Sequence, residues 1–332
     1  MARCPHGGVT GGTLICDDGV ENWQLIRFGI LDFGFWILSF KCWQSLEIQG
    51  MEIRVMSFNL RYDKPDSGDH AWRVRKQAVA ALITHYSPDI IGTQEGQAHQ
   101  LLDLHRLLPN YQSVGNDRTG NNTGEFCAIL YRTERLRCLS SQDFCLSDTP
   151  EVPGSISPAW GNPIPRMVTC AVFAIAGEET TVTVLNTHLD YKSDRARELG
   201  VMLIRDRLCL CAERNRIGRL DSTESYLFLT GDFNADPGTV PREALKSPLP
   251  NGITLHDALA GVELEHQVSF HDFTGKAIAA IDTIYYDSRL SLGNVKVDTL
   301  AWLGIWPSDH FPVVANFVAT ELNPLIQRNN KD

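Results

Sequence analysis

The chain has 332 residues, 43% of them hydrophobic and 21% charged, and this balance excludes wholesale disorder because it can supply a large core. A formal net charge of −10 argues against a protein that binds mainly through unspecific attraction to a nucleic-acid backbone. It does not argue against chemistry on phosphate groups, because carboxylates that hold metal ions add to the negative charge.

Residues 1–50 differ in character from the rest of the chain. The apolar stretch at 28–40 is interrupted by Asp32 and is shorter than the ~20 residues of a membrane-spanning helix. We therefore expect no stable membrane span and a poorly ordered or loosely attached extension, with weak membrane association through 28–40 as the alternative. The expected compact domain covers 51–320, and a tail follows at 321–332.

Hydrophobic periodicity after Met51 alternates between the repeats of strands and of helices. It predicts helices at 71–86, 97–107 and 193–216. It predicts strands at 52–59, 89–94, 125–131, 166–175, 181–187, 225–230, 281–286, 295–302 and 312–318.

The nine cysteines include no Cys-x-x-Cys pair and are odd in number, so we expect reduced thiols and an intracellular, cytoplasmic protein.

Polar side chains stand where several of the predicted strands end or begin. They are Asn59, Glu95, His188, Asp232, Asn234, Asp309 and His310. Each has an ordinary alternative explanation, because GDFNADPG at 231–238 has the composition of a turn, a lone acid is usually a surface residue and a lone histidine is usually structural. Independent turns do not explain why the pattern repeats in both halves of the chain.

The chemistry of these groups suits phosphate esters. Glu95 and Asp309 are candidate Mg²⁺ ligands, because this ion takes few protein oxygens and leaves its other positions to water and substrate phosphate. His188 and His310 are candidate acid–base groups, and Asp282 is available to orient one of them.

Six stretches, in order, resemble motifs of the endonuclease/exonuclease/phosphatase superfamily, the metal-dependent phosphoesterases that include DNase I, neutral sphingomyelinases and deadenylases. They are MSFNLRYD at 56–63, GTQEGQ at 92–97, LNTHLDYKSDRAR at 185–197, TGDFNADP at 230–237, AIDTIYYD at 280–287 and PSDHFPV at 307–313. Each motif alone is weakly specific, whereas six in the family's order are strongly specific.

One further stretch narrows the resemblance. FCLSDTPEVPGS at 144–155, followed by Trp160 and Pro165-Arg166, is similar to a less characterised branch of microbial and fungal hydrolases. One departure is Ala280, where many members place an arginine before the Ile-Asp pair. A phosphate or packing contact from that arginine is therefore missing from the pattern.

The resemblance implies an α/β fold, a four-layered α/β sandwich in which two mixed β-sheets pack face to face with helices outside. The active cleft would lie at one edge of the sheets. Asp232 would orient or deprotonate the attacking water, and Asn234 would hydrogen-bond the phosphoryl oxygens. Glu95, assisted by Asn59 and Asp309, would bind Mg²⁺ or Mn²⁺.

The resemblance also implies how the transition state is stabilised. His188 and His310, the latter oriented by Asp282, would stabilise the pentacovalent phosphorus and its leaving group, and the sequence does not say which contributes more. Substrate contacts are expected from Arg61, Trp160, Arg166 and Asp190.

The expected function is a Mg²⁺-dependent phosphoesterase that hydrolyses a phosphodiester or phosphomonoester by in-line attack of an activated water. The alternative is a nuclease, in particular a 3′–5′ RNA exonuclease whose substrate end stacks on Trp160 or Tyr62. A remote alternative is a non-catalytic binding relative, which should have lost one of the site residues. The expected partner is a phosphate-ester substrate, with RNA or another nucleic acid as the alternative, and no obligate protein partner is evident.

Overall fold

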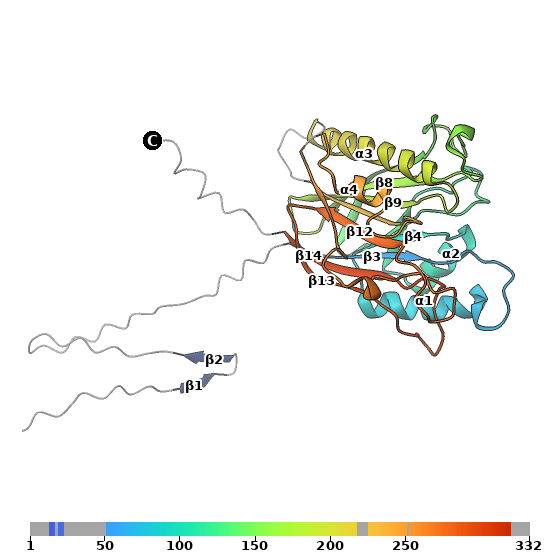
Figure 1. The fold of residues 1–332 in the computed structure, drawn as a ribbon. Coiled ribbons are helices and arrows are strands. Elements are labelled where there is room, and N and C mark those ends of the chain that lie inside the picture. The colour runs from blue at the N-terminus through green and yellow to red at the C-terminus, as the bar shows by residue number, and fades with distance from the viewer. Residues whose placement is uncertain (1–12, 17–18, 23–50, 218–224, 251, 320–332) are drawn as a thin grey trace, which may run out of the picture. The chain divides into compact units, whose positions relative to one another are not determined.

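The computed structural model describes residues 13–16, 19–22, 51–217, 225–250 and 252–319 (Figure 1). The chain divides into two units, Met1–Ile48 and Gln49–Asp332. The described part of the first unit is an antiparallel pair of strands, β1 (Thr13–Cys16) and β2 (Gly19–Asn22). The expectations for the stretch at 28–40 and for the tail at 321–332 concern residues outside the described ranges.

The second unit is built on two six-stranded mixed sheets. The first has the order β11-β12-β10-β9-β8-β7, with β7 (Leu136–Cys145), β8 (Met167–Ile175), β9 (Thr181–His188), β10 (Ser225–Asp232), β11 (Leu255–Asp257) and β12 (Asp282–Asp287). The second has the order β13-β14-β3-β4-β6-β5, with β3 (Met51–Asn59), β4 (Ile90–Gln94), β5 (Tyr111–Val114), β6 (Ile129–Arg132), β13 (Ser291–Val297) and β14 (Val313–Ala319).

Helices cover the outer face of each sheet (Figure 1). Helices α3 (Asp194–Ile217) and α4 (Val240–Lys246) pack on the first sheet, and α1 (Trp72–Tyr86) and α2 (Ala98–Leu107) pack on the second. Short 3₁₀ turns lie at η1 (Gly68–His70), η2 (Pro158–Trp160) and η3 (Leu264–His266). The expected four-layered α/β sandwich is confirmed.

Three hydrophobic clusters fill the spaces between these layers. The central cluster joins the inner faces of the two sheets and includes Val55, Phe173, Phe228 and Phe317. The other two lie between each sheet and its helices. Burying apolar area at ~25 cal/mol per Å² is the main force that holds such layers together.

Polar groups also tie the two sheets together, near the ends that carry the candidate site. A Cβ atom on Gly92 of β4 would lie 1.9 Å from Oγ1 of Thr230 in the other sheet. The absence of a side chain therefore lets the sheets approach closely. Asn186 uses this proximity, because its Nδ2 donates to the Thr93 carbonyl at 2.7 Å and its Oδ1 accepts from Gln94 at 2.7 Å.

Most predicted elements lie within one or two residues of their observed bounds, but some predictions were wrong. The strand predicted at 295–302 ends at Val297, because Asp298 turns the chain and accepts a hydrogen bond from the Trp302 indole at 3.0 Å. The strand predicted at 125–131 begins only at Ile129, as β6. Strands β5, β7 and β11 and helix α4 were not predicted.

Within the described residues, no helix is long and apolar enough to cross a membrane.

Candidate active site

Three neighbouring strands of the first sheet bring Asp232 together with two of the other predicted residues. Asp232 ends β10, where it lies opposite His188 of the parallel strand β9 and opposite Asp282 of the antiparallel strand β12. The distance from His188 Nε2 to Asp232 Oδ2 is 3.4 Å. All three side chains are buried.

The second sheet contributes Asn59 and Glu95 to the same place. Asn59 ends β3 and pairs with Gln94, the last residue of β4, so that Glu95 follows directly. The Asn59 Nδ2 group donates to Glu95 Oε1 and to Asp232 Oδ2, both at 3.1 Å. This single amide connects carboxylates from the two sheets. Its oxygen accepts the backbone N–H of Arg61 at 2.9 Å.

Asp309 and His310 enter from the loop before β14. His310 Nδ1 lies 2.8 Å from Asp282 Oδ2, which also accepts from the Ser269 hydroxyl at 2.6 Å. His310 Nε2 lies 3.9 Å from Asp232 Oδ2. Asp309 pairs with Arg61 at 3.2 Å between Oδ2 and Nη1.

The turn at 231–238 is held by its own side chains. The backbone N–H of Asn234 donates to Asp232 Oδ1 at 2.9 Å, as in an ordinary Asx turn. Asn234 Nδ2 donates to the Leu189 carbonyl at 3.0 Å, and Asp236 Oδ1 accepts the backbone N–H of Ala280 at 2.9 Å. Turn chemistry and the positioning of Asp232 are therefore both present in one stretch.

Two buried arginines that the sequence analysis missed hold the loops of the site. From α1, Arg75 donates to the carbonyls of Leu60 at 2.9 Å and Pro307 at 2.7 Å. From α4, Arg242 donates to the carbonyls of Ala235 at 3.1 Å and Ala280 at 3.3 Å. A guanidinium thus contacts the backbone at position 280, although it does not come from that position. The only sequence signal for Arg75 was a charge within the apolar face of a predicted helix, and Arg242 gave none because α4 was not predicted.

Three residues of the site adopt backbone conformations that L-amino acids rarely take. The φ angles are 57° for Arg61, 62° for Glu95 and 47° for Asn234. Such conformations cost about 1–3 kcal/mol each and persist where the surrounding contacts impose them. Here those contacts are the hydrogen bonds around Asn59 and Asp232.

Burial and neighbouring charges give the two histidines different protonation states. Burial, together with the guanidinium groups of Arg166 and Arg118, holds the pKa of His188 well below its usual value. Burial would also lower the pKa of His310, but the carboxylates of Asp282, Asp232 and Asp309 together outweigh it, Asp282 most of all, and raise that pKa to about 10. At neutral pH His188 is therefore uncharged and His310 is a cation.

Burial makes two carboxylates of the site harder to ionise. Burial, reinforced by the Asp282 carboxylate, raises the pKa of Asp232 to about 7, and burial also raises the pKa of Asp309. Donor atoms of Glu95, His188 and Asp232 all lie within 4.8 Å of one another. This oxygen-rich set fits a hard divalent cation, which would supply positive charge. Asp309 lies outside that set.

Four residues were predicted to contact substrate, and they differ in burial and in their neighbours. Arg61 lies beside Asp309. Arg166 and Asp190 are buried next to each other, with Nε and Oδ2 3.8 Å apart. Trp160 packs in the core beneath α3, and its indole N–H donates to Asp148 Oδ1 at 3.0 Å. A base cannot stack on a ring that is buried in this way, so the structure does not support that expected contact.

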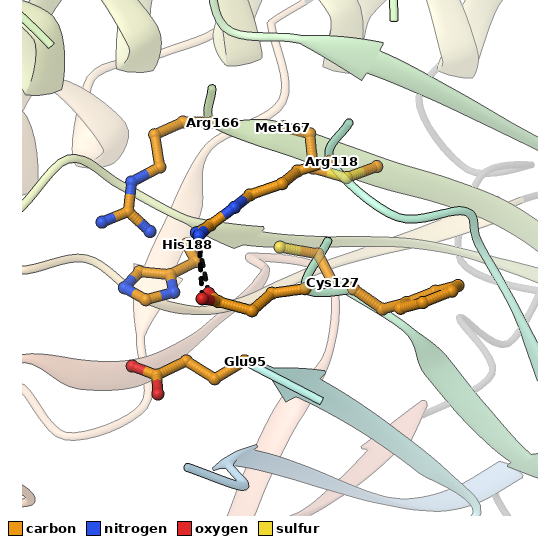
Figure 2. A pocket seen from close by; sticks show the side chains of 8 residues that line it. Glu95, Arg118, Cys127, Arg166, Met167 and His188 are labelled. Atoms are coloured by element: carbon orange, nitrogen blue, oxygen red, sulfur yellow. Dashed lines mark hydrogen bonds and ion pairs between the residues drawn. The ribbon is translucent and has the colours of Figure 1, made fainter. Parts of the chain in front are cut away.

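A small recess lies beside Glu95 and His188 (Figure 2). Arg118 and Glu125, which the sequence analysis did not identify, form part of its wall and are joined by two hydrogen bonds of 2.7 and 2.8 Å. They come from the loop between β5 and β6, whose Gly, Asn and Thr residues gave no sign of a site. Arg166 lines the same recess.

Residues 56–310 match the Endonuclease/Exonuclease/phosphatase family. The chain belongs to this family. Its members are metal-dependent hydrolases that act on phosphoric ester bonds, and this chain is such an enzyme. No curated protein matches the chain.

Several solved structures share the fold of this family member. An endonuclease/exonuclease/phosphatase from Bacteroides vulgatus is 26% identical with a TM-score of 0.71, over 81% of this chain and 99% of its own. The mannosyl-6-phosphatase of Bacteroides thetaiotaomicron is 28% identical with a TM-score of 0.68, over 80% of this chain and 99% of its own. The human Nocturnin catalytic domain is 20% identical with a TM-score of 0.61, over 80% and 93%, and supports the fold alone.

Proposed function

We propose that this protein is a Mg²⁺-dependent phosphoesterase that hydrolyses a phosphodiester or phosphomonoester by in-line attack of water activated by Asp232. The observation that carries the proposal is the hydrogen-bonded set formed by Glu95, Asn59 and Asp232 across the two sheets. A buried carboxylate whose pKa lies near 7 is suited to act as a general base at neutral pH.

Of the two residues expected to hold the ion, Glu95 belongs to the close donor set with His188 and Asp232, whereas Asp309 lies outside that set. In this proposal Glu95 and Asp309 hold the ion, and Asn59 orients Glu95 through its amide nitrogen. Mn²⁺ would suit the same oxygen atoms. When bound, the divalent ion neutralises charge on the phosphoryl group and orients it. Arg61, which already contacts Asp309, would share this neutralisation.

The two histidines have different tasks in this proposal. His310, a cation held by Asp282, donates a hydrogen bond to the charge that develops on the phosphoryl group or its leaving oxygen. His188 remains neutral and orients the nucleophilic water together with Asp232, from which it lies 3.4 Å away. Asn234 contributes a further donor to the phosphoryl oxygens.

The substrate class that we favour is a phosphate ester of a small molecule. The similarity to the mannosyl-6-phosphatase supports this choice. The alternative of an RNA exonuclease has lost one of its two proposed stacking platforms, because Trp160 is buried. Comparing hydrolysis of p-nitrophenyl phosphate, bis-p-nitrophenyl phosphate and an RNA oligonucleotide would distinguish the classes.

Metal dependence is the first testable consequence. We expect EDTA to abolish hydrolysis of the nitrophenyl esters and Mg²⁺ or Mn²⁺ to restore it. Glu95→Gln should raise the Mg²⁺ concentration for half-maximal activity by roughly tenfold or more, because a charged oxygen ligand is lost. Glu178→Gln, in an exposed turn, is the matched control. Full activity in chelator would contradict the proposal.

A further inference from the structure

The recess beside the candidate active site is lined by three of the expected site residues, Glu95, Arg166 and His188 (Figure 2). The lining residues are Glu95, Arg118, Glu125, Phe126, Cys127, Arg166, Met167 and His188. Asp232, which faces the attacking water in our proposal, does not line it, nor does His310. A substrate group bound in the recess would therefore be distinct from the scissile phosphate and would lie next to it.

Arg166 is the most unusual residue of the recess. Its side chain is 5% exposed, and its buried Nε atom has no hydrogen-bond partner among the described residues. Asp190 Oδ2 lies 3.8 Å away, too far for a hydrogen bond, while Asp190 Oδ1 already accepts from the backbone N–H of Ser193. Arg166 therefore has an ion-pair partner in Asp190 but no hydrogen bond at Nε, and a buried charged donor that lacks a hydrogen bond favours an added acceptor.

Arg118 presents a second guanidinium to the recess. Its two hydrogen bonds to Glu125 fix the planar group, and Figure 2 shows it pointing toward His188, as does Arg166. Burial lowers the pKa of Arg166, and the nearby charge of Arg118 lowers it further. An anion between them would relieve this repulsion and could accept hydrogen bonds in the forked geometry that guanidinium groups favour.

The remaining walls restrict the size of such an anion. Phe126, Cys127 and Met167 give an apolar floor, which strengthens electrostatic attraction inside the recess. The empty space is about 190 Å³ including open solvent, so the enclosed part is far smaller than a site that holds a whole small molecule. The recess therefore suits one compact group and not a sugar ring or a base.

We propose that Arg166 and Arg118 bind a second anionic group of the substrate, a carboxylate or a further phosphate, so that the enzyme prefers phosphate esters with two anionic groups. This inference rests on the proposed function, because it requires the scissile phosphate to lie between Glu95 and Asp232. Arg118 and Arg166 act as specificity-determining residues, and Glu125 positions Arg118.

The kinetic test uses three esters with one carbon skeleton. Glycerol 3-phosphate has no second anion, 3-phosphoglycerate has a carboxylate, and 2,3-bisphosphoglycerate has a carboxylate and a further phosphate. We expect kcat/KM in Mg²⁺ to be roughly tenfold or more higher for at least one of the last two than for the first, because a charge-assisted hydrogen bond is gained. Comparing 3-phosphoglycerate with 2,3-bisphosphoglycerate shows whether a carboxylate alone is enough or a further phosphate is preferred. Equal values for all three would overturn the inference.

The variants test whether the recess causes the preference. Arg166→Gln should bring the kcat/KM ratios to within about twofold of one another, since the charged donor is removed. The paired change Arg118→Gln with Glu125→Gln should reduce the ratios without leaving an unpaired charge. Arg73→Gln, an exposed arginine of α1, should leave them unchanged. An Arg166→Gln protein that keeps the wild-type ratios would overturn the inference.

A binding measurement separates this inference from the proposed function. Inorganic phosphate should raise the Tm of the EDTA-treated wild-type protein and of Arg73→Gln, but not that of Arg166→Gln. Inactivity on every ester would contradict the proposed function alone. The Tm shift would still show whether the recess binds an anion. A wild-type protein without the shift, or an Arg166→Gln protein with it, would overturn the inference. If Arg166→Gln does not fold, the Arg118 and Glu125 double variant replaces it in both assays.

Discussion

At the scale of single residues, Asp282 is proposed to act on the substrate only through His310. Its carboxylate lies 2.8 Å from the ring Nδ1 and is held by the hydroxyl of Ser269 at 2.6 Å. A buried histidine would otherwise lose its proton, because burial favours the neutral ring. Asp282 makes the largest contribution of the three carboxylates that keep His310 charged, before Asp232 and Asp309.

Removing the Asp282 carboxylate should impair turnover more than folding. Asp282→Asn keeps the shape of the side chain but removes the anion that most stabilises the His310 cation. We expect kcat on bis-p-nitrophenyl phosphate to fall by roughly 10²-fold, comparable with losing one preorganised donor. Steady-state kinetics would measure this, with KM little changed.

Asp272→Asn is the matched control, because Asp272 is exposed in the same region and asparagine tolerates its positive φ of 46°. This control should keep wild-type kcat. An Asp282→Asn protein with more than about half of the wild-type kcat would show that His310 does not need its partner.

The sequence predicted those residues of the site that stand at the ends of strands. Asp232, His188 and Asp282 meet because adjacent strands share one register. It could not predict Arg118 or Glu125, because they reach the recess from the loop between β5 and β6, and the sequence placed Glu125 in a strand at 125–131. Nor could it show that Trp160 is buried, since the same residue type serves as a core residue or as a stacking platform.

At the scale of elements, the position of the site depends on how closely β4 and β10 approach each other. Gly92 is the contact point, and a Cβ atom there would lie 1.9 Å from Thr230 Oγ1 and 2.7 Å from Asn186 Oδ1. The neighbouring backbone and side chains are buried, so they cannot move into solvent to make room.

Gly92→Ala should therefore destabilise the protein. Overpacking a buried site costs about 1–3 kcal/mol and sometimes more, and chemical denaturation should report a loss of unfolding free energy in this range. Adding Thr230→Ala should recover part of it. Gly261→Ala is the control, because a Cβ atom there would meet nothing within 4 Å. A Gly92→Ala protein as stable as wild type would mean that the sheets are not so tightly packed.

The elements predicted best are those buried on both faces or with one clear apolar face. Helix α1 and strands β9 and β10 belong to this group. Strand β7 was missed because it lies at a sheet edge with several exposed polar residues, so its apolar alternation is interrupted. Helix α4 was missed because its seven residues are too few for a periodic pattern.

At the scale of the whole molecule, the family match and the core clusters all lie after residue 50. The division of the chain falls between Ile48 and Gln49, and β3 begins at Met51. We propose that residues from Met51 onward fold and catalyse without the preceding segment. A chain that begins at Met51 should keep kcat on a soluble nitrophenyl ester within about twofold of wild type.

Circular dichroism and thermal unfolding would accompany the activity measurement on this shortened chain. We expect a Tm within a few degrees of the full-length protein, because the described clusters contain no residue before Met51. Insolubility, or a Tm far below that of the full chain, would mean that residues 1–50 contribute to the core.

The central claim is that Asp232 activates the nucleophilic water. Asp232→Asn separates this role from turn formation, because asparagine accepts the Asn234 N–H equally well but has neither charge nor basicity. Asp236→Asn, in the same turn, is the matched control. We predict a loss of roughly 10²–10⁴ in kcat for Asp232→Asn with nearly unchanged Tm, and near wild-type kcat for the control. An Asp232→Asn protein that retains more than about a tenth of wild-type kcat would contradict this mechanism.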